Sequence, residues 1–144
     1  MDRLKKTWKE AWLVSPRWRR FEQIDLTFPF SSYRKRLDKM TRDQASKLMQ
    51  IRSGHIPLNA YLFRISKTDS PFCSACHVDQ GEETPQETVT HFLFECKAHD
   101  EQRTRLAKKI GRANLNLKNI MQDEKRMRAL ANFVTKTGRF DTGT

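Results

Sequence analysis

The chain has 144 residues, and its 28 Lys and Arg exceed its 17 Asp and Glu, which gives a formal charge of +11. That length suits one ordinary domain, so we expect a single domain over residues 1–144. No apolar run reaches the ~18 residues of a membrane span, and the N-terminal MDRLKKTWKEAW lacks the apolar core of a signal peptide. We therefore expect an intracellular protein, in the nucleus or the cytoplasm.

The excess of basic side chains is concentrated in two flanks. Residues 1–54 carry fourteen basic and six acidic side chains, residues 55–100 carry three and seven, and residues 101–144 carry eleven and four. A positive field attracts polyanions, and each neutralised phosphate releases counterions. The distribution predicts a basic helical part, a less basic middle part that holds the cysteines, and a basic C-terminal part made of helices.

Apolar residues recur three and four positions apart, which predicts a mainly α fold. The first expected helix carries Leu4, Trp8 and Trp12 on one face and stops at Ser15 and Pro16. The pattern resumes over residues 18–24, and DLTFPF (25–30) is typical of an extended linker.

Further helices are expected over residues 31–40, 41–54, 58–65, 88–96, 100–111 and 123–138, with a short helical turn within 115–121. The helix after residue 40 has the clearest limits, because Thr41 and Gln44 match a capping box and Gly54 is a typical C-terminal stop. For the last helix, Asp123 is the expected N-terminal cap and Gly138 is the expected C-terminal stop.

The stretch SPFCSACHVDQGEETPQETVTHFLFECKAHD (70–100) holds all three cysteines. Cys73 and Cys76 form a Cys-x2-Cys knuckle, the usual first half of a structural zinc site. The second half is either His91 with Cys96, which gives Cys-x2-Cys-x14-His-x4-Cys, or Cys96 with His99 as the alternative fourth ligand.

Helix geometry restricts the first of these pairings. A straight α-helix would point His91 and Cys96 ~140° apart, so their pairing requires the helix to end or distort near Glu95. His77 is a weak candidate, because it is adjacent to Cys76 and neighbouring side chains diverge. Either arrangement supplies three thiolates and one imidazole, a closed set that predicts one structural Zn²⁺ ion rather than a catalytic one.

Several stretches resemble one known family: RSGHIPLNAYLFRISKTDSPFCSAC, ETVTHFLFEC, EQRTRL and the closing TGRF. They are similar to the C-terminal region, downstream of ribonuclease H, of reverse-transcriptase polyproteins from LINE-type (non-LTR) retrotransposons of fungi. The likeness covers most of the chain, and its specific part is Gly54 to Cys96. It implies that Cys73, Cys76, His91 and Cys96 are the zinc ligands.

The sequence contains neither a reverse-transcriptase Tyr-x-Asp-Asp signature nor the acidic set of a ribonuclease H, and it lacks Gly-x-Ser-x-Gly and phosphate-binding glycine loops. His55 is expected to be a helix cap or core residue rather than a base. We therefore expect no enzymatic activity.

The expected function is a zinc-stabilised nucleic-acid-binding module that holds RNA or DNA through basic helices. The expected phosphate contacts are Arg17, Arg19, Arg20, Arg34, Lys35, Arg36, Arg103, Arg105, Lys108, Lys109 and Arg112. Trp18 and Tyr33 lie among these charges and are candidates to stack on unpaired bases, although such aromatics are more often core residues. The alternative is a protein-interaction or regulatory module of a domesticated retroelement fragment.

Overall fold

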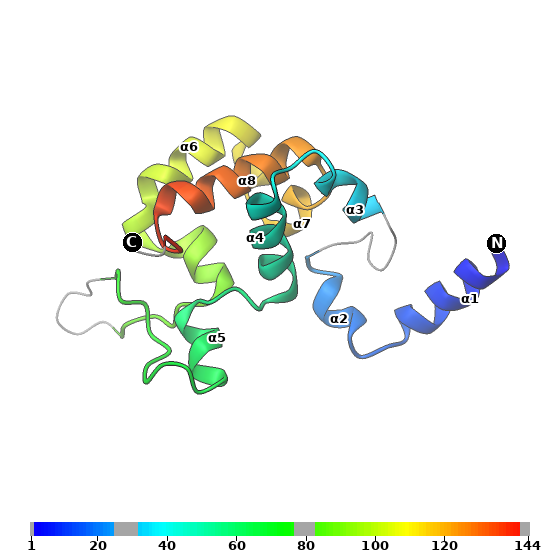
Figure 1. The fold of residues 1–144 in the computed structure, drawn as a ribbon, viewed down its shortest axis with the longest axis horizontal. Coiled ribbons are helices and arrows are strands. Elements are labelled where there is room, and N and C mark those ends of the chain that lie inside the picture. Colours follow the sequence, from blue (N-terminus) through cyan, green and yellow to red (C-terminus); the bar gives the residue numbers. More distant parts are fainter. Residues whose placement is uncertain (1, 25–31, 77–82, 142–144) are drawn as a thin grey trace.

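The structure, a computed structural model, describes residues 2–24, 32–76 and 83–141. Within these ranges the chain forms helices and one isolated β-bridge, with no strand, so the predicted mainly α fold is confirmed (Figure 1). The α-helices are α1 (Asp2–Leu13), α2 (Trp18–Phe21), α3 (Ser32–Leu37), α4 (Arg42–Ser53), α5 (Asn59–Arg64), α6 (Asp100–Ile110), α7 (Leu117–Ile120) and α8 (Glu124–Thr137). None of the described helices is long and apolar enough to cross a membrane.

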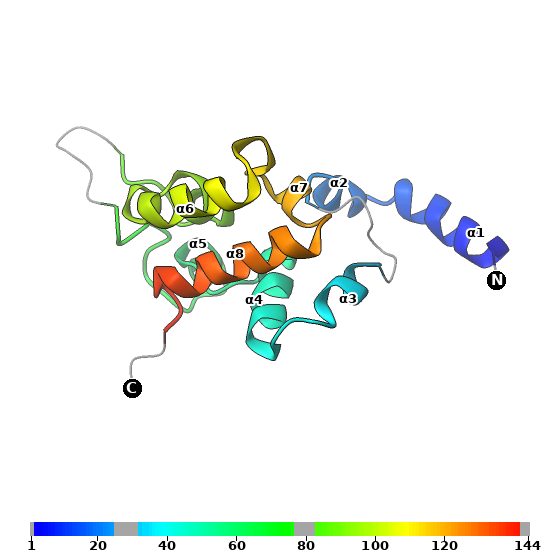
Figure 2. The same ribbon diagram turned by 90° about the horizontal axis from the view of Figure 1, so that it is seen from above.

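Helix α8 is the centre of the fold. It contacts α4, α6 and α7, and α6 lies alongside it in Figure 2. Met127, Leu130, Ala131 and Val134 recur at helical spacing on its buried face. As predicted, Asp123 caps its first turn by accepting a hydrogen bond from the Arg126 N–H, so local signals alone set where this central helix begins.

Helix α4 has the limits that the sequence predicts. The Thr41 hydroxyl accepts from the Gln44 N–H, and the Gln44 side chain accepts from the Thr41 N–H, which completes the capping box. Gly54 ends the helix at φ +75°, a left-handed conformation that favours glycine. Leu48 and Ile51 bury one side of α4 in the core.

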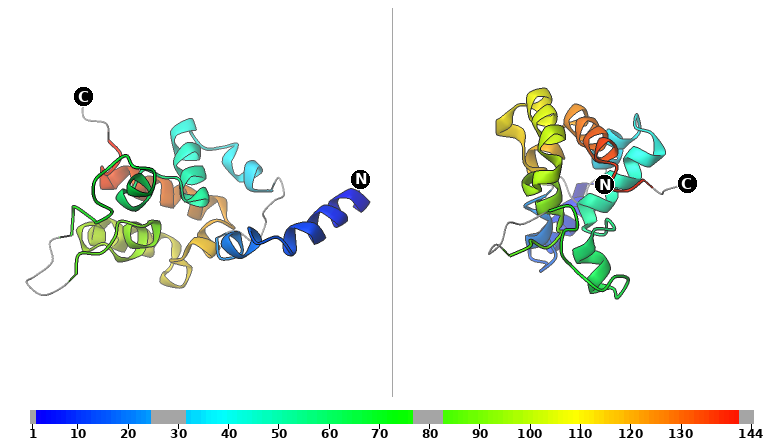
Figure 3. Two further views of the ribbon diagram at one scale, coloured as in Figure 1. Left: turned by 90° about the horizontal axis from the view of Figure 1, so that it is seen from below. Right: turned by 90° about the vertical axis from the view of Figure 1, so that its left-hand side faces the viewer.

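Helix α1 projects from the body at the N-terminal end (Figures 1 and 3). None of its residues is buried, and the exposed fractions of Leu4 and Trp8 are 79% and 58%. At the far end of the predicted apolar face, the Trp12 ring does reach a neighbour and lies 6.0 Å from the Phe21 ring. The predicted linker at 25–30 lies outside the described residues.

A buried ion pair joins the end of α8 to the middle part of the chain. Glu87 is only 2% exposed, and its carboxylate accepts from Arg139 Nε at 2.6 Å and from Arg139 Nη2 at 2.7 Å. The Asn59 N–H at the start of α5 donates to the same carboxylate at 2.7 Å. Three segments far apart in the sequence therefore meet at one carboxyl group.

Candidate metal centre

The Cys-x2-Cys knuckle is held in place by backbone pairing. An antiparallel bridge joins Phe72 to Gln86, in which the Cys73 N–H donates to the Pro85 carbonyl and the Glu87 N–H donates to the Pro71 carbonyl, both at 2.9 Å. The residues before the knuckle are thereby fixed to the segment that leads into the second ligand pair.

The second pair lies on a distorted helix, as its geometry requires. Residues His91–Glu95 form a π-helical turn, and the Cys96 N–H donates to the His91 carbonyl at 2.7 Å, a five-residue interval. Cys96 itself is extended, with φ −61° and ψ 118°. The wider turn and the extended residue bring both side chains to one side, whereas Phe92 and Leu93 are buried in the core.

Cys73, Cys76, His91 and Cys96 converge to form a candidate metal site. Their ligand atoms all lie within 4.8 Å of one another. Cys76 Sγ is 3.4 Å from His91 Nε2 and 3.6 Å from Cys96 Sγ, and Cys73 Sγ is 3.9 Å from Cys96 Sγ. None of the cysteines is in a disulfide, so all three sulfurs are available to a metal ion.

The protonation states of these groups follow from their burial. Burial raises the pKa of the Cys96 thiol to about 12 and also raises the pKa of the Cys73 thiol, so both are protonated at neutral pH until a cation displaces their protons. Burial lowers the pKa of His91, which keeps the imidazole neutral and its Nε2 lone pair free for a metal.

Neighbouring groups orient the second pair of ligands. Thr88 Oγ1 accepts from the His91 N–H at 3.1 Å, and Glu95 Oε2 lies 3.8 Å from His91 Nδ1, on the side of the ring where supporting carboxylates of metal sites are found. Arg103 donates to the Leu93 carbonyl at 3.0 Å and to the Cys96 carbonyl at 2.7 Å. One guanidinium group therefore fixes the backbone of the segment that carries His91 and Cys96.

The other histidines take different places. His99, the alternative fourth ligand, is outside the cluster; its buried ring packs edge-on against Phe92 with 5.3 Å between centroids. His55 is exposed and lies 5.3 Å from the Tyr61 ring. His77 falls outside the described residues.

The structure also places the residues expected to contact phosphates. Those that are exposed are Arg17, Arg19, Arg20, Arg34, Lys35, Arg105, Lys108, Lys109 and Arg112. Arg36 is half-buried, with its guanidinium 5.8 Å from the centre of the Tyr33 ring. Arg103 is buried and donates to the Cys96 carbonyl next to the candidate metal site. Its expected contact with a phosphate at the surface does not agree with this position.

The two aromatic side chains expected to stack on bases differ in position. Tyr33 is buried, and Arg52 lies 4.1 Å over its ring, which makes Tyr33 a core residue and not a stacking surface. Trp18 is half-buried on α2.

Sequence reasoning missed Glu87, Arg139 and Lys136 as residues of interest. Arg139 lies in the TGRF stretch, whose interest in the sequence is its family resemblance. Its partner Glu87 is 52 residues away. No local pattern connects the two. Lys136 is of interest because it lies with Arg105 and Lys109 of α6 around one groove. It is on the last turn of α8, and nothing else in the sequence distinguishes it from other surface lysines.

Comparisons of the chain with protein-family models, with curated proteins and with solved structures found no match.

Proposed function

We propose that this protein is a nucleic-acid-binding module whose middle part is held together by one structural Zn²⁺ ion. The observation that carries the nucleic-acid assignment is a groove between α6 and α8. Its volume is about 70 Å³, and it is lined by Arg105 and Lys109 from α6 and by Lys136 from α8, with no acidic residue among the lining side chains. The Arg105 guanidinium is paired with Glu101, which lies outside the lining, so Lys109 and Lys136 are the cations of this groove that favour a phosphate group.

The separations between the ligand atoms support zinc. A tetrahedral ion with Zn–S bonds of about 2.3 Å and Zn–N bonds of about 2.0 Å places sulfurs about 3.8 Å apart and sulfur and nitrogen about 3.5 Å apart. The Sγ–Sγ separations of 3.6 and 3.9 Å and the Sγ–Nε2 separation of 3.4 Å fit three of the six edges, and all four ligand atoms lie within 4.8 Å of one another. With four protein ligands no position is left for a substrate, which favours a structural role.

Charge and resemblance support the same class of partner. The two flanks carry 25 of the 28 basic side chains and the whole of the basic excess, since the middle part is net negative, and the α6–α8 groove is built from the C-terminal flank. The resemblance to the C-terminal region of LINE-type retrotransposon polyproteins points to RNA or DNA as the ligand, and we propose this origin for the chain.

Binding of a random-sequence oligonucleotide should weaken steeply as salt is raised. Each phosphate that a lysine neutralises contributes about −0.7 to −0.9 to the slope of log K against log salt. Replacing both Lys109 and Lys136 by alanine should weaken binding and reduce the magnitude of that slope by about two, one for each lost contact. Fluorescence anisotropy at several salt concentrations measures both quantities.

The matched control is Lys67→Ala, which removes an exposed lysine from the middle part of the chain, outside the groove. This variant should keep the wild-type slope. Absence of binding at low salt, or an affinity that does not respond to salt, would rule out the proposed function.

A second candidate function, protein interaction, is favoured by the exposed face of α1. Leu4 and Trp8 lie one helical turn apart, and neither is covered. Exposed tryptophans are frequent anchors of protein interfaces. If a protein partner exists, pull-downs treated with nuclease should retain it and Trp8→Ala should lose it, whereas nuclease should remove everything bound only through nucleic acid.

A further inference from the structure

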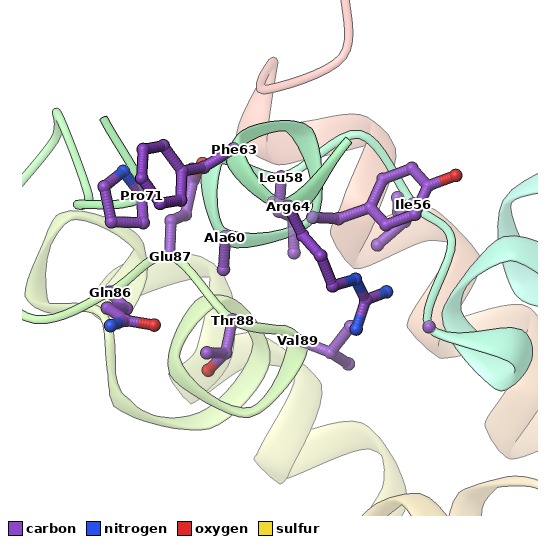
Figure 4. Close-up of a pocket in the computed structure, with 12 residues that line it drawn as sticks. Ile56, Leu58, Ala60, Phe63, Arg64, Pro71, Gln86, Glu87, Thr88 and Val89 are labelled. Carbon is purple, nitrogen blue, oxygen red and sulfur yellow. The ribbon is translucent and has the colours of Figure 1, made fainter. Parts of the chain in front are cut away.

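A second cavity lies between α5 and the segment that leads into the metal ligands (Figure 4). Its volume is about 530 Å³, within the usual range of small-molecule sites. Apolar side chains provide much of its wall, and the residues that line it are Gly54, Ile56, Leu58, Ala60, Tyr61, Phe63, Arg64, Pro71, Gln86, Glu87, Thr88 and Val89. It is distinct from the α6–α8 groove, with which it shares no lining residue.

Planar groups stand at the wall of this cavity. The Arg64 guanidinium lies over the Tyr61 ring, with 5.4 Å from Cζ to the ring centre, and it extends toward Val89 across the cavity (Figure 4). The Phe63 ring lies beside Pro71 at one end of the cavity and is 48% exposed. A guanidinium plane and open aromatic faces are the surfaces on which unpaired bases stack.

The local charge is positive although the middle part of the chain carries a net negative charge. Glu87 is the one acidic residue of the lining, and its carboxylate is already bonded to Arg139 and to the Asn59 N–H. No described carboxylate forms an ion pair with Arg64. Arg20 does not line the cavity, but its Nη2 lies 3.9 Å from where a Cβ on the lining residue Gly54 would stand.

We infer that this cavity binds one unpaired nucleotide of a single-stranded RNA or DNA. The base stacks on the Arg64 guanidinium, which the Tyr61 ring supports, and the exposed Phe63 ring, on the other side of α5, is open to the neighbouring base. The adjoining phosphate is near Arg64. The inference rests on the proposed function and adds a preference for single strands, because the bases of a duplex are stacked on each other and cannot enter.

The test compares a single-stranded oligonucleotide of about twelve nucleotides, within the usual site size, with a duplex of the same sequence. One base is 2-aminopurine, whose fluorescence falls when it stacks. The wild-type chain should bind the single strand more tightly and quench the probe. Phe63→Ala and Tyr61→Leu should each weaken single-strand binding by about tenfold, the loss of one stacked base, and leave duplex binding unchanged.

Two further variants separate stacking from charge and from folding. Arg64→Lys keeps the positive charge but lacks the plane, so it should keep the salt slope and lose quenching. Phe72→Ala removes an equally exposed phenylalanine, at 47%, that does not line the cavity. It should bind and quench like the wild type.

The possible failures can be told apart. If binding depends on salt but Phe63→Ala, Tyr61→Leu and Arg64→Lys all match the wild type, the cavity has another occupant, such as a protein segment. The present inference is then wrong while the proposed function stands. If no oligonucleotide binds, both are wrong.

Discussion

Cys76→Ser should abolish metal binding and unfold the middle part of the chain. Cys76 Sγ lies 3.4 Å from His91 Nε2 and 3.6 Å from Cys96 Sγ. Its loss removes one of the four ligands and the contact between the two ligand pairs. Zinc binding in small structural sites contributes about 10–16 kcal/mol, and that free energy is also folding free energy. Because a whole domain is stable by only about 5–15 kcal/mol, the variant should lose most of its stability.

Metal content by mass spectrometry and thermal unfolding followed by circular dichroism measure the two effects. The purified wild type should contain one zinc per chain, and a chelator should lower its melting temperature to about that of Cys76→Ser. One equivalent of zinc retained by Cys76→Ser would overturn the assignment of this ligand.

The two histidines provide a matched pair of variants. His91→Ala should lose the metal, because Nε2 is the only nitrogen in the cluster. His99→Ala removes a ring that packs on Phe92, so it should cost some stability but retain one zinc per chain. The opposite result would exchange the roles of the two residues.

The second large effect is expected at the buried ion pair. Arg139→Met removes the partner of a carboxylate that is 2% exposed. A buried charge left without its partner costs about 3–5 kcal/mol, so the free energy of unfolding in a denaturant titration should fall by about 3 kcal/mol.

A surface pair supplies the control for this loss. Arg128 and Glu124 are paired at 2.9 Å on the more exposed side of α8, and Arg128→Ala should cost only about 0.5 kcal/mol. Adding Glu87→Gln to Arg139→Met should restore part of the stability, since the amide carries no charge and can still accept from the Asn59 N–H. A loss at Arg139→Met no larger than that at Arg128→Ala would contradict the assigned role of the pair.

The parts of this structure that were predictable from the sequence are those set by neighbouring residues. The capping box at Thr41 and Gln44 and the left-handed glycines at 54 and 138 depend on interactions within one turn. The knuckle was equally clear, because two residues between thiolates make a recurrent turn. Spacing alone did not decide between His91 and His99, since both intervals occur in zinc sites. In the structure, the π-helical turn brings His91 into the cluster with the three cysteines, and Phe92 and Leu93 of the same turn are buried in the core.

The parts that escaped prediction depend on distant segments. Arg103 follows the sequence pattern of a surface arginine on an amphipathic helix, but the backbone beneath the ligands leaves the Leu93 and Cys96 carbonyls in need of a donor. Tyr33 lies among basic residues in the sequence and is nevertheless covered by Arg52 from α4. In both cases the partner is supplied only once the helices are packed.

The position of Arg139 near the C-terminal end of the chain has a consequence for synthesis on the ribosome. All four candidate metal ligands precede α8 in the sequence, so they leave the ribosome before that helix does. Until Arg139 follows, the Glu87 carboxylate lacks its guanidinium partner, and the link from α5 to the end of α8 through that carboxylate is missing. We therefore expect the candidate metal site to be able to assemble before the ion pair between Glu87 and Arg139, which then ties α5 to the end of α8.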